Sequence, residues 1–301
     1  MTIGTAQKIS VIIPAYNEQE SIPILLEQCA TRFQQSGLTG QVIVINDGSA
    51  DLTGQKLAEA KKQYPFLSIV DHQANRGITA ALESGFAKAE GDIFIYYPAD
   101  LQYSPADIPQ LVAKMNEGYD MVTGWRQGRY GGKKIVSAVY NFLSRLFFNV
   151  SVHDLNSVKA FRREIFSTIP LQADWHRYMV VLAASQGYRV AEVRIPLYPR
   201  RYGQSKFGPN RVVRAFWDFV VVVFFVKYSQ KPMVLFGNAG LACSLIGVAI
   251  LIYLAVLHFQ GQKIGDRPLL FISILIIFVG LQLFALGILG ELINQQMRRK
   301  K

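Results

Sequence analysis

The sequence predicts an α/β domain on a mostly parallel sheet with helices on both faces, followed by a helical hairpin that crosses a membrane. Residues 8–100 alternate between short β-branched runs and segments with helical spacing of apolar residues, the pattern of a parallel sheet wound by helices. Two long apolar runs without a charged residue follow near the C-terminal end. Runs of that length are typical of membrane spans.

The strand predictions begin with Ile9–Pro14, a nearly continuous β-branched run. Such a run is expected of a parallel strand covered on both faces. Three further strands are predicted at Val42–Ile45, Leu67–Asp71 and Ile93–Tyr97, and three helices at Glu20–Gln35, Leu52–Gln63 and Thr79–Ala89. Strands and helices that alternate in this way form a doubly wound sheet with right-handed connections.

The two C-terminal apolar runs are Met233–Leu257 and Pro268–Gly290. As helices each covers roughly 35 Å, enough to cross a hydrocarbon core of about 30 Å. The alternative is a pair of buried helices in a large soluble core, where uncharged runs of this length are rare. The linker His258–Arg267 is short and polar, so the two helices are expected to form a hairpin.

Basic residues predict how the hairpin is oriented. The tail at 297–301 reads Met-Arg-Arg-Lys-Lys, and the stretch before the first span is also basic. Positive charge is enriched on the cytoplasmic side of membranes. The polar segment Met1–Lys8 does not resemble a signal peptide. We therefore expect an integral membrane protein with two spans, whose α/β domain and both termini lie in the cytoplasm.

The segment Asn210–Gln230 has an apolar centre too short to span a membrane, flanked by Arg, Lys, Trp and Tyr. This composition favours an amphipathic helix at the membrane surface, with a helix packed on the sheet as the alternative. The predicted domains are therefore 1–209 for the α/β domain, 210–232 for the juxtamembrane helix and 233–301 for the hairpin with its basic tail.

Charge and cysteine content narrow the functional classes. The net charge of +11 and the pI of about 9.6 suit nucleic acid, an anionic membrane or a phosphorylated substrate. The basic residues are scattered and no nucleic-acid-binding motif is present, so we expect no nucleic-acid partner. The two cysteines, Cys29 and Cys243, form no disulfide framework or Cys/His metal cluster.

Polar clusters follow four of the predicted strands, at 14–18, 46–49, 75–77 and 100–102. In a doubly wound sheet the ligand lies beyond the carboxyl ends of the strands, so these clusters are expected to share one site. Neither a Gly-x-Gly-x-x-Gly fingerprint nor a Walker A loop is present. A metal ion or basic side chains must then neutralise any bound diphosphate.

Seven motifs in order give the site a family resemblance. They are Val11-Ile12-Ile13-Pro14-Ala15-Tyr16-Asn17-Glu18, Asn46-Asp47-Gly48-Ser49-Ala50-Asp51-Leu52-Thr53, Asn75-Arg76-Gly77, Pro98-Ala99-Asp100-Leu101-Gln102, Gly124-Trp125-Arg126, Asp154-Leu155-Asn156-Ser157 and Arg201-Tyr202-Gly203-Gln204-Ser205-Lys206. With them the chain resembles the inverting GT-A glycosyltransferases, specifically the dolichyl-phosphate mannose synthase and polyprenyl-phosphate glucosyltransferase group. The resemblance covers about Ile9 to Lys206, and the hairpin fits its bacterial-type members.

The resemblance implies transfer of a hexose from a nucleotide sugar to a polyprenyl (undecaprenyl or dolichyl) phosphate, with inversion. The two-span hairpin favours UDP-glucose as donor, and GDP-mannose is the alternative. The partners implied are the nucleotide sugar, the lipid phosphate and the bilayer. Gly237 and Gly240 permit helix contact, which leaves a homo-oligomer open.

The resemblance also implies a divalent metal, Mg²⁺ or Mn²⁺, held by Asp100 and Gln102. Oxygen ligands suit both ions. The family usually has Asp-Ala-Asp-Leu-Gln here, whereas this chain has Pro98 in place of the first acid, which weakens the metal site or marks an inactive transferase. The alternative for Asp100 is an N-cap of the segment beginning near Ser104.

The donor nucleotide is expected at the ends of the first three strands. By resemblance, Pro14, Tyr16, Glu18 and Asp47 hold the base and ribose. The alternative for Asp47 is a turn residue, because Asp-Gly is a common turn dipeptide. Asn75 and Gly77 either contact the nucleotide or only shape their turn.

The acceptor phosphate is already anionic near neutral pH, so catalysis is expected to rest on positioning and charge stabilisation rather than on a strong base. Arg126 resembles the family arginine that binds phosphate. Further predicted contacts to the acceptor or the departing diphosphate come from Lys133, Lys134, Arg200, Arg201, Ser205 and Lys206. Anionic lipid headgroups are the alternative partner of the last four.

Four more residues are expected to position the sugar or the acceptor, and the alternative for each is a structural role. They are Asp154, Ser157, His176 and Arg177.

Two rival functions remain. A processive polysaccharide synthase lacks support, because the chain has no Gln-x-x-Arg-Trp segment and few spans. The second rival is a non-catalytic membrane adaptor that binds nucleotide sugars. It is suggested by Pro98, which replaces the usual first acid of the motif.

Overall fold

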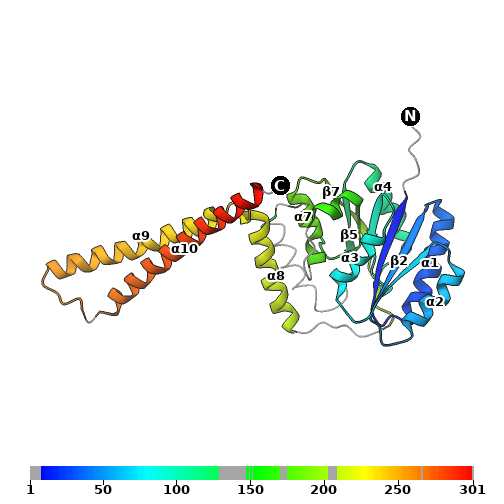
Figure 1. The fold of residues 1–301 in the computed structure, drawn as a ribbon, viewed down its shortest axis with the longest axis horizontal. Helices are drawn as coiled ribbons and strands as arrows, with labels where there is room; N and C mark the ends of the chain where they lie inside the picture. Colours follow the sequence, from blue (N-terminus) through cyan, green and yellow to red (C-terminus); the bar gives the residue numbers. More distant parts are fainter. Residues whose placement is uncertain are drawn as a thin grey trace. The chain divides into compact units, whose positions relative to one another are not determined.

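The predicted mostly parallel α/β architecture is confirmed by a computed structural model, which contains a seven-stranded sheet in the order β3-β2-β1-β4-β6-β5-β7 (Figure 1). The strands are β1 Ile9–Ala15, β2 Gly40–Asp47, β3 Leu67–His72, β4 Ile93–Tyr96, β5 Met121–Gln127, β6 Lys159–Arg162 and β7 Val190–Pro196. The structure describes residues 8–128, 147–148, 150, 152–169, 175–202, 209–265 and 267–299.

Helices connect the strands and cover both faces of the sheet. In the α/β domain they are α1 Ser21–Ser36, α2 Thr53–Gln63, α3 Ile78–Lys88, α4 Ile108–Asn116, α6 Arg163–Thr168 and α7 Met179–Ser185, with short 3₁₀ turns η1 Pro105–Asp107 and η2 Trp175–Tyr178. The predicted elements between 9 and 97 begin and end within two residues of the observed ones. Their periodicity was therefore a sufficient guide to this half of the domain.

One strand departs from the parallel arrangement. β6 runs antiparallel between β4 and β5, with Lys159 opposite both Tyr96 and Thr123. All the other strand pairs are parallel. The start of β6 therefore lies at the same edge of the sheet as the carboxyl ends of its neighbours, and it brings residues 154–159 to that edge.

The central strands are buried on both faces, as their continuous apolar runs predict. On one face β1 and β2 pack with α1, α2 and α4 in a single apolar cluster. On the other, Gly85 of α3 lies so close to Ile12 and Ile45 that a Cβ there would come within 2.5 Å of the Ile12 side chain. Rings of Phe86, Phe94 and Phe161 pack together beside it. These contacts fix the sheet whose edge carries the site.

The chain divides into two compact units, Met1–Asp218 and Phe219–Lys301. Helix α8, Pro209–Tyr228, corresponds to the predicted juxtamembrane helix, and its Phe216 and Trp217 are 58% and 61% exposed. The predicted division at 209 and 232 stays a prediction, as does the position of α8 at a membrane surface.

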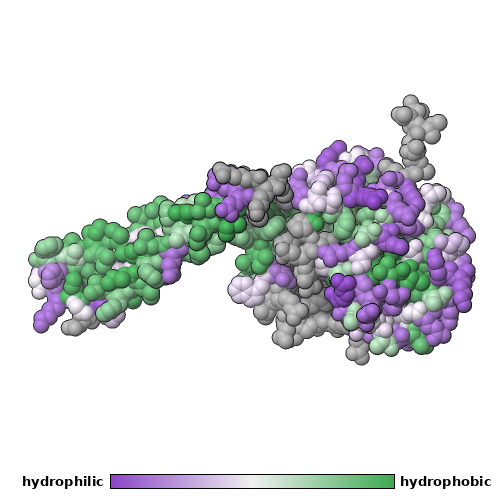
Figure 2. Space-filling view, in the orientation of Figure 1, coloured by the Kyte–Doolittle hydropathy of each residue, from purple (hydrophilic) through white to green (hydrophobic). Residues whose placement is uncertain are grey.

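Two long helices form an apolar hairpin, α9 Pro232–Phe259 and α10 Pro268–Arg299. Both are long and apolar enough to cross a membrane, and only 17% and 11% of their most apolar windows are buried. Figure 2 shows their surface to be largely apolar. The alternative of buried core helices therefore does not describe this hairpin, whose surface suits a bilayer.

Small residues pack α9 against α10. A Cβ on Gly240 would come within 2.5 Å of the Gly280 carbonyl oxygen, and one on Gly280 within 2.3 Å of the Ser244 hydroxyl. A Cβ on Gly237 would meet the Met233 side chain of its own helix at 2.8 Å. The glycines that left a homo-oligomer open thus serve packing within the hairpin, and oligomerisation stays a prediction.

Candidate active site

The loops after β1 and β2 are tied to each other. The Asn17 amide donates to the Ser49 hydroxyl at 3.0 Å, and the Asn17 side-chain carbonyl accepts from the Ala50 amide at 2.9 Å. The Glu18 amide donates to the Thr53 hydroxyl at 2.9 Å. Asn17 adopts a left-handed backbone with φ of 57°, a conformation that Asn tolerates better than most residues. These bonds hold Glu18 at the carboxyl edge of the sheet.

Asp47 at the end of β2 is buried and organises the loop after β3. Its carboxylate accepts from the Arg76 and Gly77 amides, each at 2.9 Å, and lies 2.7 Å from Nδ1 of His72. The turn role that Asp-Gly suggested therefore extends to a second loop. Gly77 has φ of +84°, so it shapes that turn, while the predicted nucleotide contacts of Asp47 and Gly77 stay predictions.

Pro14, Tyr16 and Asn75 also lie at this edge. Pro14 belongs to β1 and is partly buried, Tyr16 follows the strand and Asn75 is exposed in the loop after β3. His72 was missed by the sequence analysis, although it is the last residue of β3 and its Nε2 lies 3.0 Å from the Ser84 hydroxyl. Its place at a strand end was the signal that could have found it.

Asp100 follows β4 at the same edge. One carboxylate oxygen lies 2.7 Å from a guanidinium nitrogen of Arg200, and the other accepts from the Gln102 amide at 3.2 Å. Its side chain is 13% exposed. The alternative role as an N-cap is wrong, because the Ser104 hydroxyl caps η1 by accepting from the Ala106 amide. Leu101 is held at φ of 55°, strain of a kind that gathers at functional sites.

Glu18 is close enough to Asp100 for their charges to interact. Burial raises the pKa of the Glu18 carboxyl, a hydrogen bond from Ser21 lowers it, and the negative charge of Asp100 raises it further. Arg200 is the nearby cation that offsets this repulsion. Two carboxylates whose negative charges act on one another form an arrangement that a divalent cation would stabilise.

The donor set fits a divalent metal only together with substrate. No group of three His, Cys, Asp or Glu side chains gathers among the described residues. Mg²⁺ is usually held by one or two carboxylates plus substrate phosphates, which Asp100 and Glu18 satisfy. The Gln102 backbone carbonyl accepts from the Tyr198 amide at 3.0 Å, which leaves its second lone pair and the side-chain oxygen as the candidates for metal ligation by Gln102.

Arg126 and Asp154 form a bidentate ion pair. Nε and Nη2 of Arg126 lie 2.5 and 2.8 Å from the two Asp154 oxygens, and the Asp154 side chain is fully buried. Burial lowers the pKa of Arg126, but Asp154 and Tyr103 outweigh that effect and raise it overall. Asp154 therefore braces the arginine, which matches its structural alternative, while the 18% exposed Arg126 stays available to a ligand.

A buried lysine lies beside this pair and was missed by the sequence analysis. The Lys159 side chain is 0% exposed, its amine donates to the Ser157 carbonyl at 2.8 Å, and it lies 5.5 Å from the centre of the Tyr96 ring. Burial lowers its pKa to about 7; Asp154 raises it, and Arg126 and Arg177 lower it. The sequence analysis predicted no strand at this position and did not consider Lys159, because the neighbouring strands that bury it are distant in the sequence.

The remaining predicted positioning residues gather near Lys159. Ser157 packs against Gly124, where a Cβ would come within 2.6 Å of the serine hydroxyl. The buried His176 ring lies edge-on to Tyr96 with centroids 6.3 Å apart. Nε of Arg177 is buried with no hydrogen-bond partner among the described residues.

Four predicted cationic or phosphate-binding residues cannot be placed. Lys133, Lys134, Ser205 and Lys206 lie outside the described residues. Arg200 is paired with Asp100, and Arg201 is exposed next to it. Of the predicted acceptor contacts, the described part of the chain therefore brings Arg200 to Asp100 and Arg126 to Asp154.

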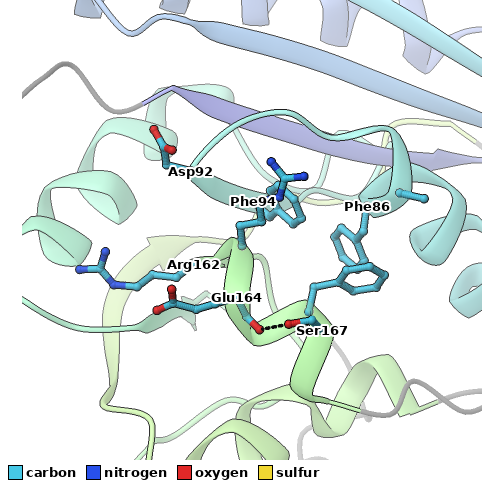
Figure 3. Close-up of a pocket in the computed structure, with 9 residues that line it drawn as sticks. Phe86, Asp92, Phe94, Arg162, Glu164 and Ser167 are labelled. Atoms are coloured by element: carbon cyan, nitrogen blue, oxygen red, sulfur yellow. Dashed lines mark hydrogen bonds between the residues drawn. The ribbon is translucent and has the colours of Figure 1, made fainter.

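A pocket of about 790 Å³ lies at the opposite edge of the sheet (Figure 3). It is lined by residues at the start of β4 and the end of β6, such as Asp92 and Arg162, and by the Phe86 ring. Figure 3 also shows the Ser167 hydroxyl donating to the Glu164 carbonyl, at 2.8 Å. Because the chemistry-bearing residues lie at the carboxyl ends, this pocket is separate from the candidate site.

Comparisons with known proteins agree with this geometry. Residues 10–177 match the family model for glycosyl transferase family 2. The chain is 32% identical over 304 residues to the dodecaprenyl-phosphate galacturonate synthase of Rhizobium johnstonii, covering 97% of this chain and 89% of that protein. It is 30% identical over 296 residues to the undecaprenyl-phosphate 4-deoxy-4-formamido-L-arabinose transferase of Salmonella typhimurium, covering 96% and 89%.

Solved structures share the fold. The glucosyl-3-phosphoglycerate synthase of Mycobacterium tuberculosis, in complex with Mn²⁺, UDP and glucosyl-3-phosphoglycerate, aligns with a TM-score of 0.56 and 20% identity. The alignment covers 72% of this chain and 78% of that one. A complex of the same enzyme with phosphoglyceric acid gives a TM-score of 0.59 at 19% identity, over 73% and 80%.

Proposed function

This chain belongs to glycosyl transferase family 2, and on that premise we propose that it transfers one hexose from a nucleotide sugar to a polyprenyl phosphate. The observation that carries the proposal is the combination of a charged sheet edge with an exposed apolar hairpin in one chain. The two relatives that are similar over nearly the whole chain, hairpin included, are both named for sugar transfer to or synthesis on a polyprenyl phosphate.

The donor nucleotide is proposed to bind over the loops after β1, β2 and β3. Pro14, Tyr16 and Glu18 would contact it, and Asp47 would hold the loop that carries Asn75 and Gly77. A divalent cation would bind Asp100, Glu18 and the Gln102 side chain together with the donor's phosphates, where it would neutralise charge on the departing diphosphate. A structural neighbour solved with Mn²⁺ and UDP supports such an ion on this fold.

The acceptor oxygen is already negatively charged, so the site needs cations and alignment more than a base. Arg126 is proposed to bind a phosphate, because Asp154 fixes its guanidinium in one orientation. Arg200 and Arg201 would supply further positive charge, with Lys133, Lys134, Ser205 and Lys206 as predicted additions. Direct displacement at the anomeric carbon would invert its configuration.

The donor is proposed to be UDP-glucose. GDP-mannose is the alternative from the family resemblance, and a nucleotide-linked galacturonate is a second alternative suggested by the name of one relative. The hairpin is proposed to span the cytoplasmic membrane with the catalytic domain and both termini in the cytoplasm, because the basic segments flank the spans on one side.

The test uses the full chain in detergent with undecaprenyl phosphate, Mg²⁺ or Mn²⁺, and radiolabelled UDP-glucose, UDP-galacturonate or GDP-mannose. We expect transfer of a single sugar to the lipid from one donor. Asp100→Asn should lower the rate at least about a hundredfold, because it removes a charge that acts on the metal and the transition state. Asp107→Asn is the matched control, since Asp107 is a buried carboxylate seven residues away that we place outside the site.

Three outcomes would contradict the proposal. Nucleotide-sugar binding without transfer by the wild type would favour the adaptor function. Formation of a polymer would favour a processive synthase. Retention of more than about a tenth of the rate by Asp100→Asn would remove Asp100 from the metal site.

A further inference from the structure

The buried lysine at the edge of the candidate site has no carboxylate paired with it alone among the described residues. Lys159 is fully buried at the start of β6, between β4 and β5. A buried cation is normally paired with a carboxylate, because an unpaired buried charge is costly. The carboxylate that acts on Lys159 is Asp154, and both of its oxygens already bind Arg126.

The groups around Lys159 carry a surplus of positive charge. The positive charges of Arg126 on β5 and Arg177 on η2 act on it, with Asp154 as the single carboxylate that does so among the described residues. The Tyr96 ring covers it from β4, and the buried His176 ring lies edge-on to Tyr96. Nearby cations and burial both favour the neutral amine. A bound anion would therefore favour the charged form of the Lys159 amine.

The protonation state of the Lys159 amine affects the turn that holds Arg126. It donates to the Ser157 carbonyl at 2.8 Å, within the turn that begins at Asp154. Asp154 also accepts from the Asn156 amide at 3.1 Å through an oxygen that binds Arg126. A charged amine makes a stronger hydrogen bond to a carbonyl than a neutral one. Protonation of Lys159 therefore stabilises the turn that orients Arg126.

We propose that Lys159 is a positioning residue whose amine takes up a proton from solvent when a phosphate anion binds beside Arg126, so that the charged amine stabilises the Asp154–Ser157 turn. The inference rests on the proposed function for the presence of that anion. Two sources share this chemistry, the donor's diphosphate and the acceptor's phosphate monoester. Because Lys159 is itself buried, it acts through the turn and through its charge, without touching the substrate.

The pH dependence of binding follows with a definite sign. The pKa of Lys159 is lowered to about 7 in the free protein, and a nearby anion raises it. Anion affinity is therefore highest below pH 7 and falls as the amine loses its proton. If the bound anion raises the pKa by about one unit, the affinity falls about sevenfold between pH 6 and pH 8.5, and binding near pH 7.5 takes up about half a proton.

The experiment measures UDP-glucose binding to the full chain in detergent by calorimetry. UDP-glucose is a suitable probe because its diphosphate does not titrate in this range. Heats in two buffers of different ionisation enthalpy give the proton uptake directly from the wild type. A second arm uses farnesyl phosphate, a monoester with a second pKa of about 6, only at pH 7.5 and above, where it is already almost entirely dianionic. Uptake in either arm identifies which phosphate is coupled to Lys159. Lys159→Met should bind with an affinity that varies less than about twofold with pH.

Ser10→Ala is the matched control. Ser10 is a buried polar residue at the amino end of β1, where its hydroxyl accepts from the Gly91 amide at 2.9 Å. This variant should lose stability yet keep the wild-type pH dependence. Binding without proton uptake in both arms, or the same pH dependence in Lys159→Met, would overturn the inference alone. Failure of the wild type to bind farnesyl phosphate and all three of UDP-glucose, UDP-galacturonate and GDP-mannose would overturn the proposed function and the inference with it.

Discussion

The two halves of the sheet hold their buried carboxylates in different ways. Asp47, in the β1–β4 half, is satisfied by backbone amides and a histidine. Asp154, beside β5 and β6, is held on both oxygens by the guanidinium of Arg126, with the Asn156 backbone amide as an additional donor at 3.1 Å. Backbone amides stay in place whatever the side chains are, whereas a guanidinium is a charge that must itself be balanced. The first half therefore keeps its shape through the backbone, and the second depends on a charge balance that a ligand can alter.

The largest expected effect comes from breaking the charge balance of the second half. Asp154→Asn removes the one buried carboxylate in the described part of the chain that acts on both Arg126 and Lys159. Loss of one partner of a buried pair costs about 3–5 kcal/mol. We expect a fall of that size in the free energy of unfolding of the α/β domain, measured by denaturant or thermal melting in detergent. Transfer should fall as well, because Arg126 loses its orientation.

Glu90→Gln provides the comparison for this variant. Glu90 pairs with Lys8 at 3.0 Å, but its side chain is 70% exposed, and exposed pairs contribute about 0–1 kcal/mol. A loss below about 1 kcal/mol in Asp154→Asn, equal to that of Glu90→Gln, would show that the buried pair is not essential to the second half.

The next effect is a pH dependence of stability that comes from Lys159. Its folded-state pKa of about 7 is below the ordinary lysine value of about 10.4. The unfolded state therefore binds more protons between these values, and stability rises with pH from 7 upward, by at most about 1.4 kcal/mol per pH unit. Thermal melting at pH 7, 8 and 9 should show this rise, and Lys159→Met should abolish it.

The pH range in which this rise in stability reports on Lys159 ends near pH 9. Burial raises the pKa of the Cys29 thiol to about 12, so unfolding releases a thiol that ionises above its ordinary value of about 8.5. Ionisation of the Cys29 thiol in the unfolded state lowers the stability as pH rises, which opposes the effect of Lys159. A melting temperature that stays constant or falls between pH 7 and 8 in the wild type would contradict a neutral buried Lys159.

The smallest effect tests the backbone of the first half. Gly48 has φ of +66°, and a Cβ there would come within 2.4 Å of the Ala74 backbone. Gly37 has nearly the same φ, +64°, but no atom within 4 Å of that position. Gly37→Ala should lower the free energy of unfolding by about 1 kcal/mol, because of the left-handed backbone alone. Gly48→Ala should lower it by about 1–2 kcal/mol more, because its Cβ also meets the Ala74 backbone.

The additional cost of Gly48→Ala should appear together with weaker nucleotide-sugar binding, because Gly48 lies against the loop that Asp47 holds. Denaturant titration and calorimetry on both variants check this. Equal losses of stability and equal affinities in the two variants would show that the loops after β2 and β3 are free to move apart.

The same contrast explains what the sequence could predict. The elements from Ile9 to Tyr97 were found because parallel strands and their helices repeat locally, and each periodicity is visible in a short window. The pairing of Arg126 with Asp154 joins residues 28 apart, and the antiparallel insertion of β6 has no local signature. Lys159 was missed for the same reason, since only the neighbouring strands bury it. Family resemblance identified Arg126 and Asp154 as site residues, but their mutual contact came from the fold.

Helix α10 extends well beyond the apolar run of the hairpin. The predicted apolar run ends at Gly290, yet α10 continues as helix to Arg299, which adds nine residues or about 14 Å. The Asn294 side chain in this extension donates to the Ser229 carbonyl, so it is joined to the residue that follows α8. The headgroup layer of one leaflet is only about 5–8 Å thick. In a bilayer that holds the apolar part, α10 would therefore emerge beyond the headgroups, and Ser229 would stand within the interfacial zone.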